Sequence, residues 1–232
     1  MSATGRGAAR VDADFYATPA WCVDRLLDLG DYACPFAQAD AFTAMEPAVG
    51  DGAIVRAVDA WRARRTMPPL SWVGTDIVDR GAGDVCRFAV EDFARSGPRL
   101  LAAADPVAAI TNPPFRLALP FAQHFVEHGA WFAMLLRINW LGGEERHAFL
   151  RENMPAVYVL PNRPSFNEEG TTDATEYAWF IWNAAGEIVA PSVRILDLTS
   201  AEERRALRVT TTVRREQTAL PFDAAPMTQT KM

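Results

Sequence analysis

The chain has 232 residues, 50% of them apolar and 22% charged, with 23 basic residues against 29 acidic ones and a net charge of -6. This is the composition of a globular protein large enough to bury a core without disulfides or metals, so a mini-protein held together by such links is excluded. The acidic balance argues against a protein that coats nucleic acid by bulk charge attraction, because that affinity needs clustered Lys and Arg. A local basic face remains compatible with it.

Apolar residues follow helical and strand spacing in alternation along the interior of the chain. In chain order we expect a helix over 19–29, a strand over 41–47, a helix over 52–61, strands over 71–77, 87–90 and 107–111, a helix over 117–128, a strand over 131–138, a helix over 144–153, and strands over 157–160 and 177–182. This alternation predicts an α/β fold with a parallel sheet covered on both faces. Ligands bind such sheets at the carboxyl ends of the strands.

The domain boundaries follow from where the periodic pattern stops. We expect a flexible N-terminus over residues 1–13, one domain over 14–198, and a C-terminal helix or tail over 199–232. No window has the roughly 18 uncharged apolar residues of a spanning helix, and the start lacks a signal-peptide stretch, so we expect a cytoplasmic protein with no membrane partner. Cys22, Cys34 and Cys86 form no Cys-x-x-Cys pair and are expected to be buried, reduced thiols.

The first two predicted strands, over 41–47 and 71–77, each carry an acidic residue at or near their end, Glu46 and Asp76. The first leads into Glu46-Pro-Ala-Val-Gly50-Asp-Gly52, where the glycines permit a tight turn and a close approach to the backbone. Because Glu46 would repel phosphate, a neutral or cationic ligand fits this turn better than a phosphate. Asp76 ends the next strand about 25 residues on, the separation at which nucleotide-type folds bind ribose hydroxyls.

Two further strand ends carry aromatic residues beside polar ones. Asp92 next to Phe93 suits the amino edge and the face of an adenine, although each alone is more often a surface carboxylate or a core residue. In Asn112-Pro-Pro-Phe115 the prolines remove two N–H donors. The side-chain carbonyl of Asn112 and the main-chain carbonyl of Pro113 are then left to accept hydrogen bonds from one exocyclic NH2 group, with Phe115 stacked beneath the ring.

The order of these segments resembles a known family. Asp14-Phe-Tyr-Ala-Thr18-Pro19, the glycine turn, Gly74-Thr-Asp-Ile77, Glu91-Asp-Phe93 and Asn112-Pro-Pro-Phe115 resemble the motifs of S-adenosylmethionine-dependent amino methyltransferases, above all the DNA adenine-N6 methyltransferases of bacteria and phages. The resemblance covers about residues 14–183. It implies a Rossmann-like class I methyltransferase, with a mostly parallel seven-stranded sheet, helices on both faces and an antiparallel edge strand at residues 177–182.

The resemblance also implies roles for individual residues. Thr18 would meet the methionine carboxylate, Asp76 would hold the ribose, and Asp92 would hold the adenine of S-adenosylmethionine. The residues implied to bind this cofactor are Tyr16, Thr18, Pro19, Glu46, Pro47, Gly50, Gly52, Asp76, Ile77, Asp92, Phe93 and Asn112. The residues implied to act in catalysis are Asn112, Pro113, Pro114 and Phe115. The implied reaction is direct methyl transfer to N6 of an adenine flipped out of duplex DNA.

DNA recognition is expected in two loops within residues 139–175, because the chain after Asn112-Pro-Pro-Phe115 is short. The candidates for contact with nucleic acid are Arg137, Asn139, Trp140, Arg163 and Phe166. The alternative, ordinary loop residues, is about as well supported.

Three other interpretations stay open. His124-Phe-Val-Glu127-His128 matches a zinc hydrolase pattern, with only Glu202 or Glu203 as a third ligand, and we expect no metal there. The same Asn-Pro-Pro-aromatic motif also occurs in enzymes that methylate RNA adenines or protein glutamine amides. A protein that binds the cofactor without catalysis is the third, although the intact Asn112 argues against it.

Overall fold

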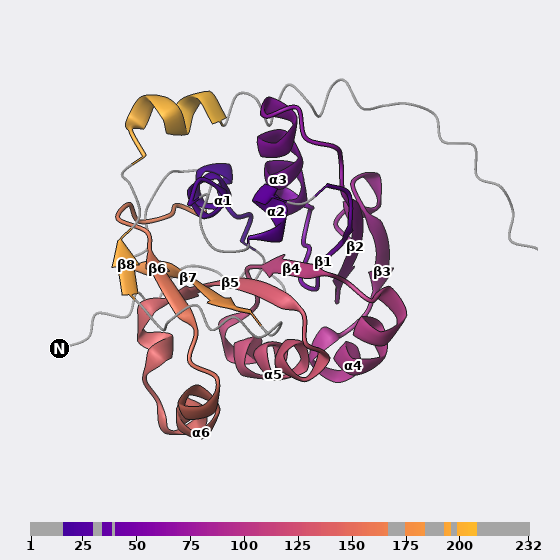
Figure 1. The fold of residues 1–232 in the computed structure, drawn as a ribbon, viewed down its shortest axis with the longest axis vertical. Coiled ribbons are helices and arrows are strands. Elements are labelled where there is room, and N and C mark those ends of the chain that lie inside the picture. Colours follow the sequence, from indigo (N-terminus) through magenta and orange to yellow (C-terminus); the bar gives the residue numbers. More distant parts are fainter. Residues whose placement is uncertain are drawn as a thin grey trace, which may run out of the picture.

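The computed structural model describes residues 16–29, 34–38, 40–166, 175–183, 193–195 and 199–207. These residues form an eight-stranded sheet with the order β3-β2-β1-β4-β5-β7-β6-β8 (Figure 1). The strands are β1 Thr43–Glu46, β2 Ser71–Asp76, β3 Arg87–Val90, β4 Ala108–Thr111, β5 Trp131–Arg137, β6 Ala156–Val159, β7 Tyr177–Trp182 and β8 Val193–Ile195. Every pairing is parallel except those of β7, which runs antiparallel to β5 and β6.

Helices cover both faces of the sheet. The helices are α1 Ala20–Leu27, α2 Pro35–Gln38, α3 Ala53–Arg64, α4 Phe93–Ala104, α5 Ala118–His128 and α6 Glu144–Glu152, and residues 201–207 are also helical. Short 3-10 helices span Ala82–Asp84, Phe115–Leu117 and Ile138–Leu141. Figure 1 shows α1, α2 and α3 on one face of the sheet and α4 and α5 on the other. The sheet is therefore the middle of three layers.

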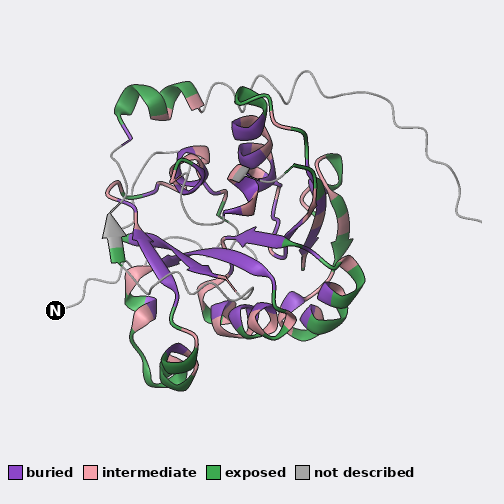
Figure 2. Ribbon diagram, viewed as in Figure 1, coloured by how far each residue is buried: buried purple, intermediate pink, exposed green. Residues whose placement is uncertain are grey.

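The central strands are apolar on both faces because each face packs against helices. Along β5, Trp131 and Leu135 point into the core on the α1 and α3 side, whereas Phe132 and Leu136 point into the core on the α4 and α5 side. The strand β7 alternates in the same way. Figure 2 shows these strands as the most continuously buried part of the fold. Two cores thus share one sheet, which explains the unbroken apolar runs in the sequence.

The predicted α/β class and the mostly parallel sheet are confirmed, and three details differ. The antiparallel strand β7 lies between β5 and β6 rather than at an edge, and the short β8 adds an eighth strand beside β6. Helix α4 was not predicted, because Gly97-Pro98 in its middle is a pattern that normally interrupts a helix. The expectations for residues 1–13, for Asp14, for 167–174 within the recognition loops and for 208–232 lie outside the described residues.

The helix over residues 201–207 packs against α1. It begins with a capping box in which Ser200 and Glu203 bond each other's main-chain N–H groups, at 3.2 and 2.7 Å. The guanidinium of Arg25 in α1 donates to the Thr199 hydroxyl at 2.8 Å and forms an ion pair with Glu203 at 3.3 Å. This helix is therefore anchored to α1.

The three cysteines are free thiols. Cys22 and Cys34 are buried, and Cys86 is half-buried. Burial raises the pKa of all three thiols, to about 12 for Cys34 and to about 11 for Cys86. A thiol with a raised pKa carries little thiolate at neutral pH, so these side chains are poor nucleophiles.

Candidate active site

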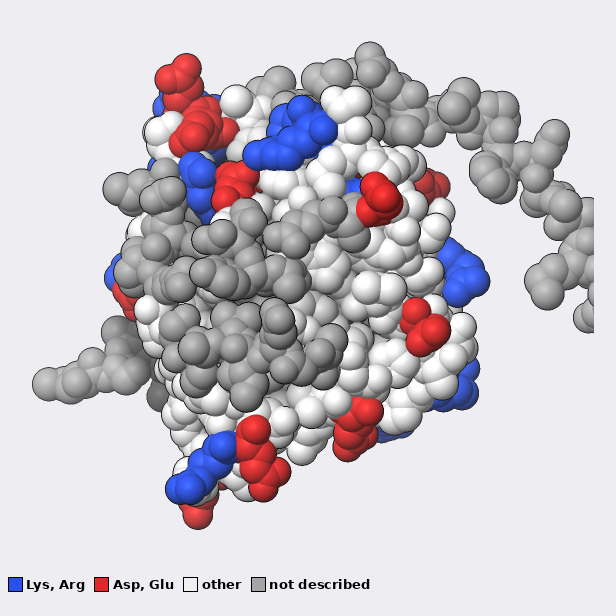
Figure 3. Space-filling view, in the orientation of Figure 1, with Lys and Arg blue, Asp and Glu red and all other residues white. Residues whose placement is uncertain are grey.

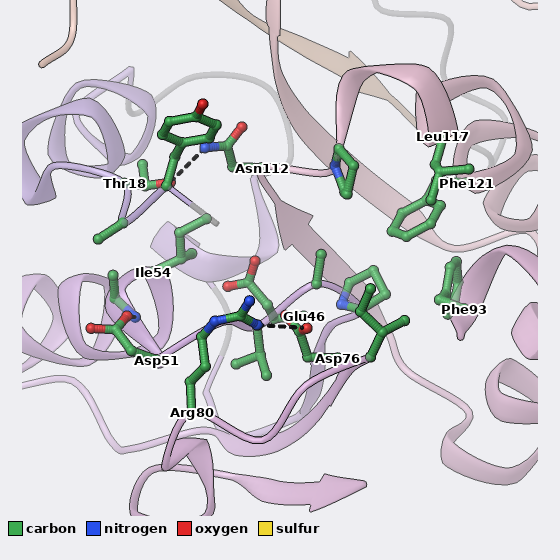
Figure 4. Close-up of a pocket in the computed structure, with 18 of the residues that line it drawn as sticks. Thr18, Glu46, Asp51, Ile54, Asp76, Arg80, Phe93, Asn112, Leu117 and Phe121 are labelled. Carbon is green, nitrogen blue, oxygen red and sulfur yellow. Dashed lines mark hydrogen bonds and ion pairs between the residues drawn. The ribbon is translucent and has the colours of Figure 1, made fainter. Parts of the chain in front are cut away.

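A cleft opens at the carboxyl ends of β1, β2 and β4, where the strand order reverses between β1 and β4. The empty space at this cleft, open solvent included, is about 670 Å³. Of the residues predicted from the sequence, it brings together Tyr16, Thr18, Glu46, Pro47, Asp76, Ile77, Asp92, Phe93, Asn112 and Pro114. Figure 4 shows the labelled residues of this cleft arriving from both halves of the sheet. Segments separated in sequence by almost a hundred residues thus share one site.

Several predicted residues flank the cleft without lining it: Pro19, Gly50, Gly52, Pro113 and Phe115. Sequence reasoning also missed part of the wall, which includes Ile54, Arg80, Leu117 and Phe121. Three of these four are apolar residues in or beside helices, where periodicity cannot distinguish a cleft wall from a core position.

The glycine turn after β1 is held in a shape that other residues do not adopt easily. Gly50 and Gly52 have φ values of 54° and 85°, and Gly52 precedes α3 as its N-cap. A Cβ atom on Gly52 would lie 2.5 Å from Cγ2 of Val85, so the turn also needs a residue without a side chain there. The predicted close turn is present at this position.

Asp76 organises the cleft from the end of β2. Its Oδ2 accepts a hydrogen bond of 2.9 Å from the main-chain N–H of Gly50, which ties the glycine turn to the neighbouring strand. Its Oδ1 accepts from the main-chain N–H of Val78 and from Arg80 Nη1, both at 3.1 Å. Figure 4 shows the ion pair between Arg80 and Asp76 within the cleft. The acid predicted to hold a ribose therefore also sets the loop geometry.

Glu46 lies at the end of β1, is 1% exposed and points into the cleft (Figure 4). Its Oε2 has no hydrogen-bond partner among the described residues. Burial raises the pKa of this carboxyl well above its usual value. Asp76 and Asp51 act in the same direction, whereas Thr111 and the main chain of Asn112 oppose them. The Glu46 carboxyl thus lies away from solvent with one oxygen unpartnered among the described residues.

Asn112 follows β4 and faces the segment before α1. Its side-chain NH2 donates to the Thr18 hydroxyl at 3.1 Å, which links two predicted site residues 94 positions apart (Figure 4). The side-chain carbonyl oxygen of Asn112 accepts no hydrogen bond from a described residue. Pro113 is buried and Pro114 lines the cleft. The loop thus offers an amide oxygen at the cleft, with its orientation fixed by Thr18.

Asp92 and Phe93 mark the start of α4. The Asp92 side chain accepts from the main-chain N–H of Ala94 at 3.0 Å and so caps the helix. Phe93 is 2% exposed, with its ring 4.7 Å from that of Phe121 and 5.2 Å from that of Phe125. Asp92 therefore caps α4 and Phe93 packs in the core, and both residues also line the cleft.

Phe115 belongs to an aromatic cluster with Tyr177, Phe166 and Tyr16. The sequence did not indicate Tyr177 as a site residue. The Tyr177 ring lies 5.9 Å from that of Phe115 and 5.1 Å from that of Phe166, whose ring is 6.0 Å from that of Tyr16. The guanidinium of Arg137 lies 4.8 Å from the Phe115 ring centre, and its Nε donates to the Tyr177 hydroxyl at 3.2 Å. The predicted catalytic and DNA-binding residues therefore meet here.

The other predicted DNA contacts differ in their surroundings. Trp140 is 5% exposed and packs edge-on against Phe180 and Trp182, at 5.6 and 5.9 Å, so the expectation that it contacts DNA does not agree with its burial. Asn139 is exposed, and Arg163 forms an exposed ion pair of 2.6 Å with Glu176.

Charged side chains of both signs are interspersed on the face drawn in Figure 3. The basic side chains of the described residues do not gather into one patch on that face. Of the helices in the described ranges, none combines the length and apolar character needed to cross a lipid bilayer.

The His-x-x-Glu-His pattern on α5 does not form a ligand set. His124 Nε2 lies 3.1 Å from the main-chain oxygen of Ala94, and His128 Nε2 lies 3.7 Å from Asp105. Glu203, named as a third ligand, bonds Arg25 of α1, which packs on the opposite face of the sheet (Figure 1). Within the ranges that the structure describes, no three His, Cys, Asp or Glu side chains are close enough together to hold a metal ion.

Comparison with known proteins identifies the fold of the chain. No family model matches the chain, and no curated protein matches it in sequence. A protein described as a class I S-adenosylmethionine-dependent methyltransferase from Listeria monocytogenes matches with a TM-score of 0.54 and 15% identity, over 84% of this chain and 70% of that one. The methyltransferase subunit of a type I restriction-modification system from Streptococcus thermophilus matches with a TM-score of 0.55 and 14% identity, over 85% of this chain and 53% of that one.

The chain has the class I methyltransferase fold. It spans only about half the length of the restriction-modification subunit. At this level of identity the similarity concerns the fold, and the chemistry has to be argued from the residues of the cleft.

Proposed function

We propose that this protein transfers the methyl group of S-adenosylmethionine to the N6 amino group of adenine in DNA. The observation that carries the proposal is the position of Asn112, which follows β4 at the cleft, is oriented by Thr18 and precedes Pro113, Pro114 and Phe115. The similarity of the fold to a restriction-modification methyltransferase also supports it.

The residues of the cleft fit this cofactor. Glu46 has a buried oxygen without a partner and suits the ammonium of the methionine part, while the Thr18 hydroxyl suits its carboxylate. Asp76 lies where a ribose would bind, and Ile77 and Asp92 border the place of an adenine. The cofactor supplies an activated methyl group when bound. The carboxylates around it favour a positively charged ligand over a phosphate.

The target nitrogen would be held by two acceptors. The Asn112 side-chain oxygen and the Pro113 main-chain oxygen accept the two N–H groups of the adenine N6. This draws the lone pair out of conjugation with the ring and points it at the methyl group. The cofactor would supply the methyl group and keep the electron pair of the S–C bond, and the amino nitrogen would lose one N–H proton to solvent. Alignment of the two reactants supplies much of the rate enhancement.

The target base has to leave the duplex to reach this place. Flipping costs a few kcal/mol, which stacking on Phe115 partly offsets. Arg137 lies beside Phe115 and carries the positive charge closest to this ring among the described contacts, so it is our candidate for contact with the flipped nucleotide. Asn139, Arg163 and Phe166 are the further candidates.

The test is incubation of the purified protein with labelled S-adenosylmethionine and, separately, duplex DNA, single-stranded DNA, RNA and a protein extract, followed by digestion and mass spectrometry. We expect N6-methyladenine from DNA, and none with Asn112→Ala although that variant still binds the cofactor. Gln123→Ala removes an amide from the exposed face of α5 and is the matched control. Transfer only to RNA or to protein amides would exclude DNA as the acceptor. Cofactor binding without any transfer would exclude the reaction.

A further inference from the structure

Arg116 directly follows Phe115, and the sequence did not indicate it as a site residue. It lies in the 3-10 helix Phe115–Leu117 that leads into α5. Its neighbours Pro114 and Leu117 line the cleft, whereas the Arg116 side chain is exposed. Arg116 therefore lies at the rim of the cleft, beside the residue on which the target base is proposed to stack.

The turn that carries Arg116 is fixed on both sides. Pro113 and Pro114 restrict the backbone before it, because their rings fix φ. The main-chain N–H of Leu117 donates to the oxygen of Pro114 at 2.7 Å, and Ala118 after the turn is fully buried. The Arg116 side chain therefore starts from a defined position relative to the aromatic ring that precedes it.

Arg116 differs from the other arginines around the cleft in its partners. It makes no hydrogen bond, ion pair or ring contact with another described residue. Arg137 bonds the Tyr177 hydroxyl and lies over the Phe115 ring, so its guanidinium is already engaged. The arginines that form ion pairs with acids of the cleft are Arg56, Arg80, Arg95 and Arg99, and their partners are Asp51, Asp76, Asp92 and Glu91.

The fold does not account for this charge. Arg116 is the only residue with a formal charge between Asp105 and Glu127, with histidine counted as neutral. It lies at the N-terminal end of α5, whose first turn contains no acid. A cation is unfavourable there, because the helix dipole is positive at its N-terminus. The Arg116 charge is therefore exposed, unpaired among the described residues and of no benefit to the helix.

We propose that Arg116 binds a backbone phosphate of the DNA strand that carries the target adenine, next to the flipped nucleotide. This inference rests on the proposed function and adds a contact to it. A guanidinium suits this ligand because its planar N–H groups match two phosphate oxygens. A phosphate contact holds the strand in position without reading its sequence. Because the net charge of the protein is -6, local contacts of this kind have to supply the attraction that bulk charge does not.

The test is the kinetics of methyl transfer to unmethylated duplex DNA over a series of salt concentrations. In Arg116→Gln we expect KM for DNA to rise by about tenfold at low salt, with the change in KM rather than in kcat, because a phosphate contact is present in both the ground state and the transition state. The slope of log KM against log salt should fall by about 0.9, the value for one neutralised phosphate. Arg116→Lys should restore the slope, since an ammonium also pairs with a phosphate.

Arg87→Gln is the matched control. It removes the same charge from an exposed arginine at the amino end of β3, whereas the cleft opens at the carboxyl ends of the strands. Urea denaturation should show that Arg116→Gln is no less stable than the wild type, since the side chain makes no contact that the fold requires.

The outcomes separate this inference from the proposed function. Equal KM values and salt slopes in Arg116→Gln and Arg87→Gln would overturn the phosphate contact. A fall in kcat at unchanged KM, or a salt slope that Arg116→Lys does not restore, would also contradict it. Failure of the wild type to methylate DNA would instead overturn the proposed function, and the contact with it.

Discussion

The Nε2 atom of His124 on α5 lies 3.1 Å from the main-chain oxygen of Ala94 on α4. In a regular helix that oxygen accepts from the N–H four residues later, and here that residue is Pro98, which has none. His124 therefore supplies the missing donor, and its Nε2 carries the hydrogen. Gly97 allows the close approach, because a Cβ atom there would lie 2.3 Å from the His124 ring. These four residues form one packing unit between the two helices.

Removal of the imidazole should loosen this unit. His124→Ala leaves the partly buried Ala94 oxygen without this partner and opens a cavity, so we expect the free energy of unfolding to fall by about 1–3 kcal/mol. Urea denaturation followed by circular dichroism measures it. His128→Ala is the matched control, since its ionic partner Asp105 is exposed. An equal loss in both variants would contradict the special role of His124.

Addition of a methyl group on the facing side should have a related effect. Gly97→Ala forces the imidazole away from α4, and overpacking of this kind costs about 1–3 kcal/mol. The double variant Gly97→Ala, His124→Ala relieves the clash, so its loss should be smaller than the sum of the two single losses. The same denaturation experiment gives all four values of the cycle. Strict additivity would show that the two side chains do not interact.

Asp76 should affect both the cofactor and the glycine turn. Asp76→Ala removes the acceptor of the Gly50 N–H as well as the proposed partner of the ribose, so we expect the affinity for S-adenosylhomocysteine to fall by about tenfold to a hundredfold. Titration calorimetry measures this change. Asp79→Ala, an acid three residues on that accepts from the Gly81 N–H, should leave the affinity unaltered. Unchanged affinity in Asp76→Ala would mean that the ribose site lies elsewhere.

Trp179 links β7 to α1 through a hydrogen bond of 2.8 Å from its Nε1 to the main-chain oxygen of Cys22. Trp179→Phe removes this donor in a buried setting, and we expect a loss of about 1–3 kcal/mol in the free energy of unfolding. Trp131→Phe is a matched control, because the buried Trp131 Nε1 has no partner among the described residues. The control should lose less. The reverse order would show that ring volume matters more than the hydrogen bond.

The sequence predicted the sheet closely, because the strands that are buried on both faces are unbroken apolar runs. Predicted strand boundaries at 131–138 and 177–182 agree with the buried strands β5 and β7 within one residue. Helix α4 was not predicted, since the effect of Gly97-Pro98 is offset by a side chain on another helix. Local pattern carries no information about such a partner.

The cleft was predicted in part for a similar reason. Polar residues at strand ends indicated Glu46, Asp76 and Asn112, and the family resemblance indicated Thr18. These four residues line one cleft. Arg80 was missed because its importance lies in the ion pair with Asp76, which a turn brings about. Trp140 was a candidate for contact with DNA because it follows a strand end, and in the structure it packs against aromatic residues of β7.

The anchoring of α1 has a consequence for the order in which the cleft is completed during synthesis. Thr18 lies two residues before the start of α1. This helix contacts Trp179 through Cys22 and Thr199 through Arg25, over sequence separations of 157 and 174 residues. A nascent chain that has emerged only as far as Asn112 contains every acid of the cleft and the α3 side chain Arg64, which pairs with Asp24 of α1, but it lacks Trp179 and Thr199. The segment that holds Thr18, the partner of Asn112, is therefore translated first. Part of its support comes from Trp179 and Thr199, which are translated near the end of the described chain.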